Sequence, residues 1–155
     1  MSVEIHNGDI FEAPVDVIVH QCNCFNTMGA GIAKEIKKRY PRAAQVDRLT
    51  ERGDYKKLGQ FTVALADEKQ NKTIINLYGQ FRYGRDKRYT DYKAVERGLE
   101  NIHSWLTHME MTNKVIGIPY KIGCMNAGGN WEIVEGLIRK VFEESKIKVL
   151  ICKYE

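Results

Sequence analysis

The sequence predicts an α/β fold in which a mixed β-sheet is covered by helices on both faces. Apolar runs typical of buried strands alternate along the chain with stretches whose apolar residues repeat at a helical period. One pair of apolar runs is separated only by a short polar segment, which indicates an antiparallel hairpin beside otherwise parallel strands. The 155 residues, 43% of them hydrophobic, suffice for a real core, and we expect a single domain over residues 1–155.

Four elements are predicted in the first part of the chain. Val17, Ile18 and Val19 form the centre of a buried strand. Pro41 is expected to stop the first helix, because proline lacks the backbone N–H that a helix interior needs, and Gly53 to end the second. The predicted elements are the strands Val3–His6 and Asp16–Gln21 and the helices Ile32–Tyr40 and Arg42–Arg52.

The second part of the chain adds the hairpin, two longer helices and two further strands. Val95, Leu99, Ile102 and Leu106 recur at the spacing of one helix face, and Pro119 closes a short core strand. The predicted elements are the hairpin strands Phe61–Ala66 and Thr73–Tyr78, the helices Asp91–His108 and Trp131–Phe142, and the strands Val115–Ile118 and Lys148–Cys152.

Composition excludes several classes of protein. A formal net charge of +4 is mild, and we do not expect nucleic acid as a partner. No apolar run approaches the length of a membrane span and the N-terminal MSVEIHNGD lacks a signal core, so we expect no membrane partner and a cytoplasmic location. Cys22 and Cys24 have no second cysteine pair at zinc spacing, so we expect reduced thiols and no metal site.

The segment from His20 to Ala33 carries the strongest functional signal. It passes from a strand through small polar residues to the turn Gly29-Ala30-Gly31 and then into a helix. Free backbone N–H groups at a helix start, beside a loop with little side-chain bulk, favour a phosphate or pyrophosphate. We therefore interpret this segment as a nucleotide-diphosphate site.

A second glycine loop runs from Ile122 to Trp131. Gly128 and Gly129 permit close backbone approach to an anion, and Asn130 is suited to cap the helix that begins at Trp131. Cys124 is more simply a packed thiol than a nucleophile, because no histidine is adjacent in sequence to activate it. Both loops follow strands, so we expect them to meet at the carboxyl edge of the sheet, where such folds bind ligands.

Three polar side chains are candidates for contact with that ligand. Asp9 can accept a hydrogen bond from the exocyclic amine of adenine, although an aspartate that closes a turn or caps a short helix is the simpler explanation of this residue taken alone. Asn23 can donate and accept at once, which suits a ribose diol, or it can cap the backbone. His20 can act as a base or an acid near neutral pH, or hydrogen-bond a neighbouring backbone group.

The segment Gln80–Tyr89 mixes aromatic and basic residues. This mixture resembles a small surface for single-stranded nucleic acid. Because the segment is short and the total charge modest, we interpret it instead as a rim over an anionic ligand or a solvated loop.

These motifs together resemble a macrodomain. The resemblance rests on elements that occur in the expected order over nearly the whole chain, and its most specific part is His-x-Cys-Asn-Cys joined to Met-Gly-Ala-Gly-Ile-Ala. Within the family the chain resembles the branch that contains ADP-ribose-1''-phosphate phosphatases and certain ADP-ribosyl-ester hydrolases. The elements are Gly8–Ile10, Ile18–Cys24, Met28–Ala33, Arg39–Pro41, Ile118–Pro119, Ile122–Cys124 and Ala127–Trp131.

The resemblance implies a three-layer α/β/α sandwich that binds ADP-ribose in a cleft at the rim. It implies that Asp9 meets the adenine, Ile10 lines the adenine pocket and Asn23 contacts the distal ribose. The first glycine loop would wrap that ribose and the diphosphate, and the second would close over the diphosphate. The implied ligand-binding residues of the two loops are Met28, Gly29, Ala30, Gly31 and Ile32, and Cys124, Met125, Asn126, Ala127, Gly128, Gly129 and Asn130.

The chain departs from the ester-hydrolysing members at two positions. They use a lysine after the strand that corresponds to Thr73–Tyr78 and an acid in the second loop, where this chain has Gly79-Gln80 and Ala127. The resemblance therefore favours a monomer without cofactor that removes phosphate from ADP-ribose-1''-phosphate without a metal, with His20 and Asn23 as catalytic residues. The alternatives are a non-catalytic ADP-ribose-binding module and, third, a hydrolase of ADP-ribosyl esters or nucleic-acid adducts.

Overall fold

The computed structural model describes residues 2–154, which form a six-stranded sheet, four α-helices and one short 3-10 turn. Along the chain the elements are β1 (Val3–Asn7), β2 (Val17–Cys22), α1 (Gly31–Arg39), α2 (Pro41–Arg48), the 3-10 turn η1 (Tyr55–Lys57), β3 (Phe61–Ala64), β4 (Thr73–Tyr78), α3 (Tyr92–His108), β5 (Ile116–Pro119), α4 (Trp131–Phe142) and β6 (Val149–Lys153).

The sheet is mixed, as predicted. Its strand order is β1-β6-β5-β2-β4-β3, and every neighbouring pair is parallel except β3 with β4. The antiparallel pair is the predicted hairpin, in which Phe61 lies opposite Leu77. The last strand of the chain, β6, lies between β1 and β5, so segments from both ends of the chain meet in the sheet.

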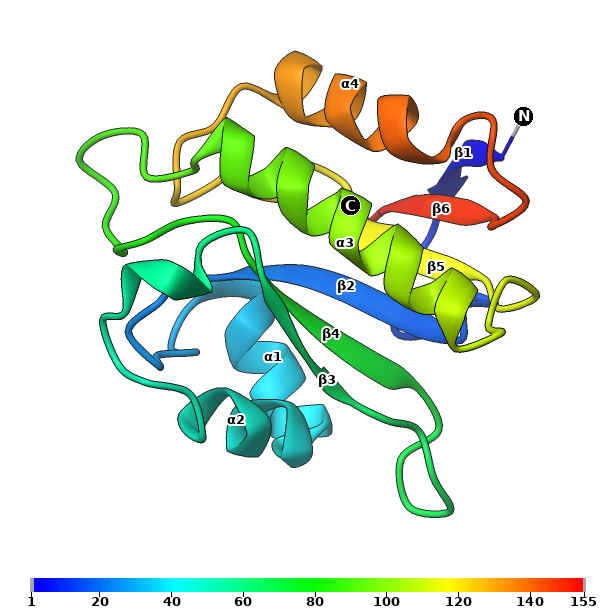
Figure 1. Cartoon of the computed structure of the whole chain (residues 1–155), viewed down its shortest axis with the longest axis horizontal. Coiled ribbons are helices and arrows are strands. Elements are labelled where there is room, and N and C mark those ends of the chain that lie inside the picture. Colours follow the sequence, from blue (N-terminus) through cyan, green and yellow to red (C-terminus); the bar gives the residue numbers. More distant parts are fainter. Residues whose placement is uncertain (1, 155) are drawn as a thin grey trace.

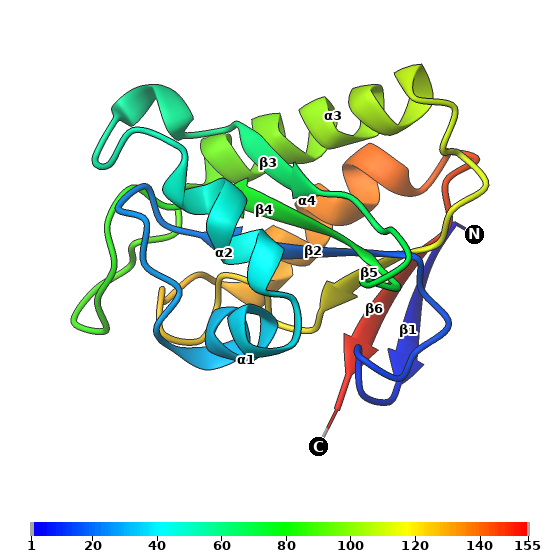
Figure 2. The same ribbon diagram turned by 90° about the horizontal axis from the view of Figure 1, so that it is seen from below.

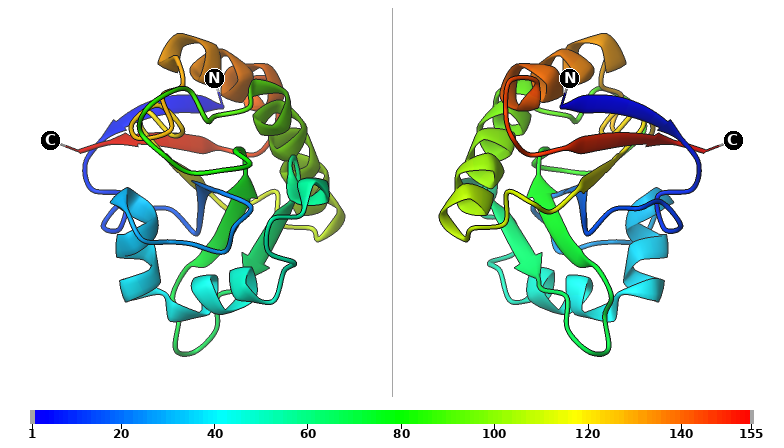
Figure 3. Two further views of the ribbon diagram at one scale, coloured as in Figure 1. Left: turned by 90° about the vertical axis from the view of Figure 1, so that its left-hand side faces the viewer. Right: turned by 90° about the vertical axis from the view of Figure 1, so that its right-hand side faces the viewer.

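Helices cover both faces of the sheet, which makes the fold a three-layer α/β/α sandwich. Helices α3 and α4 lie on one face, and α1 and α2 lie on the other (Figures 1 and 3). Each face has its own apolar core. Leu99 of α3 and Ile138 of α4 belong to one, and Ile36 of α1 and Ala43 of α2 belong to the other.

The boundaries of α2 differ from the prediction. Pro41 begins this helix instead of only ending the one before, because the first helical position has no N–H to donate and tolerates proline. The helix ends at Arg48 rather than Arg52. Thr50 Oγ1 donates to the carbonyl of Asp47, and Gly53 N donates to the carbonyl of Cys24, so the chain is drawn toward the end of β2. The turn η1 that follows was not predicted.

The loops that leave β2 and β5 lie at one edge of the sheet, together with the short turn that follows β1. In Figure 2 the loop after β5 overlaps helix α1 in the view, and residues of both, Met125 and Ile32 among them, line one cavity. None of the helices described is long and apolar enough to cross a membrane.

Candidate functional site

Two adjoining cavities form one cleft at this edge of the sheet. The first has a volume of about 630 Å³ and the second a volume of about 410 Å³. The two cavities are continuous because they share lining residues from β2, the first glycine loop and the second. The shared residues are Gln21, Ala30, Ala33, Gln80, Arg85, Asn126 and Ala127.

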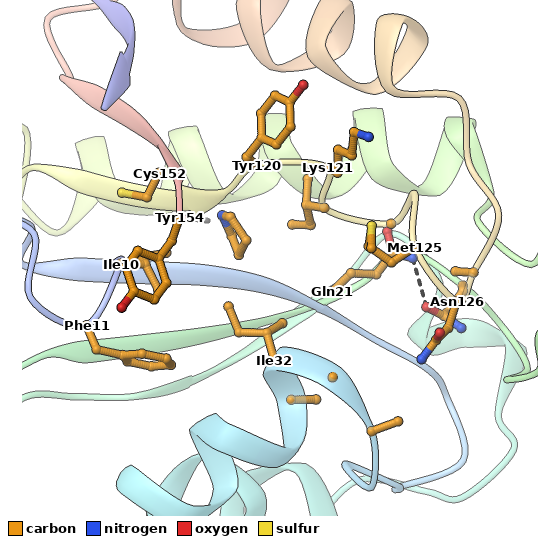
Figure 4. A pocket seen from close by; sticks show the side chains of 18 of the residues that line it. Ile10, Phe11, Gln21, Ile32, Tyr120, Lys121, Met125, Asn126, Cys152 and Tyr154 are labelled. Carbon is orange, nitrogen blue, oxygen red and sulfur yellow. Dashed lines mark hydrogen bonds between the residues drawn. The ribbon is translucent and has the colours of Figure 1, made fainter. Parts of the chain in front are cut away.

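The far end of the first cavity is apolar except for one carboxylate. Figure 4 shows Ile10, Phe11 and Tyr154 grouped at this end, while Gln21 and Asn126 lie at the other. Asp9 lines the same end. Its Oδ1 accepts from the backbone N–H of Phe11 at 3.0 Å, and its carbonyl accepts from two further N–H groups. Asp9 therefore closes a turn and also borders the cavity.

The start of helix α1 forms one wall of the cleft. Its N-cap residue, Ala30, makes no side-chain cap, whereas Asp91 caps α3 and Asn130 caps α4 with side-chain oxygens. Gly31 has a φ of +57°, a left-handed conformation that glycine adopts without strain. Gly31, Ile32 and Ala33 line the first cavity, so the N–H groups of the uncapped first turn lie at its wall.

Some residues of the second glycine loop line the cleft, and others connect the loop to neighbouring segments. Met125, Asn126 and Ala127 line the cleft. Gly128 has a φ of +72°, and a Cβ atom there would lie 3.0 Å from the carbonyl oxygen of Lys87. The carbonyl of Ala127 accepts from the N–H groups of both Tyr89 and Thr90. The loop is thus joined to the segment that precedes α3.

Four residues implied in this loop lie outside the lining of both cavities: Cys124, Gly128, Gly129 and Asn130. Cys124 Sγ donates to the carbonyl of Ile122, and burial raises the pKa of its thiol to about 11. Gly129 N donates to the carbonyl of Gly123 at 2.9 Å. Asn130 caps α4, as predicted, with its Oδ1 2.9 Å from the N–H of Glu132.

The second cavity is lined by polar side chains. Asn23 Oδ1 accepts from Phe25 N at 2.8 Å, and its Nδ2 donates to Thr27 Oγ1 at 2.7 Å. Gln21 Nε2 donates to Gln80 Oε1 at 2.8 Å and to Thr90 Oγ1 at 2.9 Å. These bonds order the loop after β2 and tie the end of that strand to the segment after β4.

The second cavity has a cationic character. Arg85 lines it, and no aspartate or glutamate is among its described lining residues. Of the first glycine loop, Gly29 lines this cavity and Ala30 lines both, whereas Met28 is buried in the core beneath α1 and lines neither.

His20 lies away from the cleft, contrary to the expectation from the sequence. It is 0% exposed and lines neither cavity. Its Nε2 lies 2.6 Å from Oδ1 of Asn76, and burial lowers the pKa of its imidazole to about 4. The reason is that β2 continues past His20 to Cys22, so His20 lies inside the strand, whereas Gln21 and Cys22 at the end of the strand line the cleft.

Sequence reasoning missed several residues of the cleft. Gln21 had a local signal, since it follows His20 at a strand end. Others come from segments distant in the chain, and the strand order brings them to the cleft. The missed residues with large side chains are Phe11, Gln21, Pro119, Tyr120, Lys121, Ile122, Cys152 and Tyr154, whereas Gln80, Tyr83 and Arg85 belong to the segment interpreted as a rim or a solvated loop.

Fold and cleft together define the class of protein. The chain belongs to the Macro domain family, whose model matches residues 19–138. A 17.5 kDa phage T4 protein from the tk-vs intergenic region is 33% identical over 159 residues, covering 100% of this chain and 98% of its own.

Other relatives carry names that refer to ADP-ribose. A DNA ADP-ribosyl glycohydrolase of Mycobacterium tuberculosis is 26% identical over 139 residues, which cover 89% of this chain but only 38% of that protein. An ADP-ribose 1''-phosphate phosphatase of Aspergillus oryzae is 41% identical over 46 residues, covering 29% of this chain and 23% of that protein.

Solved structures of the same fold agree with this assignment. The macrodomain of Mycobacterium tuberculosis DarG superposes with a TM-score of 0.78 at 21% identity, covering 98% of this chain and 96% of that one. Thermosipho africanus DarTG, solved in complex with ADP-ribose, has a TM-score of 0.75 at 19% identity, covering 96% of this chain and 40% of that one.

Proposed function

We propose that this chain binds ADP-ribose in its cleft and hydrolyses the phosphate from ADP-ribose-1''-phosphate. The polarity of the cleft carries the proposal. A carboxylate and apolar side chains lie at one end and an uncapped helix start lies in the middle; Arg85 lines both cavities, and the second cavity has no carboxylate among its described lining residues. An adenine, a diphosphate and an anionic group on a distal ribose need these three environments in this order.

The adenine would occupy the end formed by Asp9, Ile10, Phe11 and Tyr154. Its ring is flat and apolar, which suits the aromatic side chains that Figure 4 shows there. The exocyclic N6 amine donates hydrogen bonds, and the Asp9 carboxylate accepts them. Asp9 Oδ1 is already bonded to Phe11 N, so Oδ2 is the oxygen we assign to the amine.

The diphosphate would lie across the start of α1. The first-turn N–H groups of a helix have no partner within the helix, and the positive end of the helix dipole favours an anion. Gly31 adds no side chain at this point, and the loop of Met125, Asn126 and Ala127 lies on the opposite wall. The diphosphate would thus be held between the two glycine loops.

The distal ribose and its 1''-phosphate would occupy the second cavity, near Asn23, Gln21 and Arg85. Hydrolysis forms a bond from a water oxygen to phosphorus and breaks the bond from phosphorus to O1''. O1'' leaves with a proton that the water loses. The transition state is loose and spreads charge over the phosphoryl oxygens, so a positioned guanidinium and backbone N–H groups can stabilise it without a metal ion.

His20 takes no part in the proposed hydrolysis. Its imidazole is fully buried, lines neither cavity and is hydrogen-bonded to Asn76, so it is not placed to contact a water in the cleft. Asn23 is retained as a positioning residue, because its bonds to Phe25 and Thr27 shape the loop that lines the second cavity.

A second candidate is a module that binds ADP-ribose without turnover. The observation in its favour is that no histidine and no carboxylate is among the described residues lining the second cavity. A third candidate is hydrolysis of an ADP-ribosyl adduct, as in the names of some relatives. It is less well supported, because Gln80 replaces the lysine of the ester-hydrolysing branch that this chain resembles.

One set of measurements distinguishes these candidates. Calorimetric titration with ADP-ribose, with adenosine monophosphate for comparison, should show tighter binding of ADP-ribose, since only this ligand fills both cavities. Phosphate release from ADP-ribose-1''-phosphate should be saturable and should be competed by ADP-ribose. Binding without phosphate release would favour the module, and release of ADP-ribose from a modified peptide or oligonucleotide would favour the third candidate. Absence of ADP-ribose binding would contradict the whole proposal.

A further inference from the structure

A cluster of aromatic side chains adjoins the second cavity through Tyr83, which lines it. It comprises Phe25 from the loop after β2, Tyr55 from η1, and Phe81 and Tyr83 from the segment after β4. Tyr55 stacks on Phe81 with ring centroids 3.7 Å apart and an interplanar angle of 4°. Phe25 meets the ring of Phe81 edge-on at 4.9 Å and that of Tyr83 at 6.4 Å. The three segments lie at the same end of the molecule in Figures 1 and 2.

Two of these rings are open to solvent. Tyr55 is 68% exposed and Tyr83 is 48% exposed, although aromatic side chains usually lose much of their surface on folding. Only one face of the Tyr55 ring is covered by Phe81, so its other face is available to a flat partner. Stacking on Phe81 also fixes the orientation of that ring.

Arginine side chains surround the same cluster. The guanidinium carbon of Arg82 lies 5.0 Å from the centroid of Phe25, and that of Arg52 lies 5.7 Å from it. Arg85 follows in the same segment. Within the part of the chain that the structure describes, none of these three arginines forms an ion pair with a carboxylate. We call Phe25, Tyr55, Phe81, Tyr83, Arg52, Arg82 and Arg85 the aromatic–basic surface.

The excess positive charge of the chain is concentrated in the segments that build this surface. Residues 51–57 and 80–89 contain seven basic and three acidic side chains, and their difference equals the net charge of +4 of the whole chain. The remaining residues are therefore neutral on balance. A modest total charge argued against a nucleic-acid partner, but it describes the average of the chain and not this one surface.

We propose that the aromatic–basic surface binds single-stranded nucleic acid. Unpaired bases would stack on the exposed faces of Tyr55 and Tyr83, and the phosphates would contact Arg52, Arg82 and Arg85. Stacking requires bases that are not already paired, which favours a single strand over a duplex. An acidic protein would satisfy the arginines but would leave the oriented rings unused.

The surface leads directly into the cleft, because Tyr83 and Arg85 also line the second cavity. A strand bound there would pass the opening through which a group attached to the distal ribose would leave the cleft. Binding of an unmodified strand to this surface does not depend on the proposed function.

Fluorescence anisotropy with a labelled twelve-nucleotide oligothymidylate, and with oligouridylate as a second arm, tests the proposal. The wild type should bind both, since stacking does not require a particular sugar, and a duplex of the same length should bind more weakly. Tyr55→Ala should weaken binding about fivefold or more, the range measured for loss of one stacked base. Arg82→Gln should weaken binding and lower the slope of log affinity against log salt by about 0.7.

Two control variants distinguish loss of the aromatic–basic surface from loss of a hydroxyl group or of net charge alone. Tyr55→Phe keeps the ring and should bind like the wild type, which would show that the ring and not the hydroxyl is needed for binding. Arg48→Gln removes an equal charge from the exposed side of α2 and should leave oligonucleotide binding unchanged. Tyr55→Ala should also bind ADP-ribose normally. The proposal would be overturned if the wild type did not bind the oligonucleotides or if Tyr55→Ala bound them as tightly as the wild type. It would also be overturned if duplex DNA or polyglutamate bound as tightly as the single strands. These outcomes hold whatever the ADP-ribose titration shows.

Discussion

The imidazole of His20 and the amide of Asn76 form a buried pair, with Nε2 of one 2.6 Å from Oδ1 of the other. Asn76 Nδ2 donates to the carbonyl of Ala43 and to Thr62 Oγ1. Its Oδ1 is therefore an acceptor, and the proton of the neutral His20 ring must lie on Nε2. The pair fastens β2 to β4 and to the start of α2, which is a structural role.

This pair predicts a pH dependence of stability. Burial lowers the pKa of His20 to about 4 from an ordinary value of 6.5. Between these values the unfolded chain binds a proton that the folded chain does not, so the free energy of unfolding should fall as the pH falls from about 6.5 to 4. The full loss is on the order of 3 kcal/mol. Below pH 4 this group causes no further loss.

Urea unfolding of the wild type and of His20→Gln at several pH values measures this effect. Glutamine can still donate to Asn76 but does not titrate, so the stability of the variant should depend less on pH over this range. The carboxylates titrate in both proteins, so their contribution to the pH dependence of stability cancels when the two proteins are compared. Parallel pH profiles would contradict the assignment, and a loss of phosphate release in a folded His20→Gln would return His20 to the mechanism.

Removal of the Arg85 guanidinium should weaken ADP-ribose binding. Hydrogen bonds to charged groups contribute about 1.5 to 3 kcal/mol, and the exposure of Arg85 places the expected effect near the lower value, about tenfold in Kd. Titration calorimetry of Arg85→Gln at two salt concentrations measures it, and the difference from the wild type should shrink at high salt. Arg48→Gln serves as the charge control. Equal losses in the two variants would show that only net charge matters.

Asp9→Asn should change which base the cleft prefers. The asparagine Oδ1 can still accept from Phe11 N, while Nδ2 replaces the oxygen that we assign to the adenine amine. A donor would then face a donor, and the hypoxanthine analogue, which has a carbonyl at that position, should become the better ligand. Competition between ADP-ribose and inosine diphosphate ribose measures the preference. An unchanged preference for adenine would place the base elsewhere in the cleft.

A methyl group at Gly128 should destabilise the protein, whereas one at Gly136 should not. Gly128 is left-handed and a Cβ would press on the backbone of Lys87 and Arg88, so Gly128→Ala should cost about 1 to 3 kcal/mol and lower Tm by several degrees. Gly136 lies exposed inside α4 with nothing near its Cβ position, and Gly136→Ala should raise stability by about 0.5 to 1 kcal/mol. Thermal melts of both variants check the opposite signs.

The sequence predicts the long helices better than the residues of the cleft. Helices α3 and α4 match their predicted ranges within one residue, because each has an apolar period and a capping side chain, Asp91 or Asn130. The end of α2 could not be predicted, since the carbonyl of Thr50 accepts from Asn26 Nδ2 and Gly53 N donates to the carbonyl of Cys24, and both bonds join segments distant in the chain.

Of the residues predicted for the candidate site, Asp9, Ile10 and part of each glycine loop line the cleft, and their contacts with a ligand stay a prediction. These segments could be named from the sequence because strand ends and turns are local features. Tyr154 comes to the same cavity only because β6 lies beside β1, a pairing between residues far apart in the chain. Strand periodicity shows that His20 and Gln21 face opposite ways, but it could not show that β2 continues to Cys22, which leaves His20 inside the strand and away from the cleft.

The position of β6 in the sheet determines when, during synthesis, the protein can complete its fold and its binding site. Strand β1 is made first, yet its one neighbour in the described sheet is β6, which is made last. Until residues 149–153 have left the ribosome, the first strand has no hydrogen-bonded partner in the sheet, and the wall that includes Cys152 and Tyr154 is missing from the cleft. A chain released before that point would lack both a closed sheet and a complete binding site, so ligand binding would report that translation had reached the final strand.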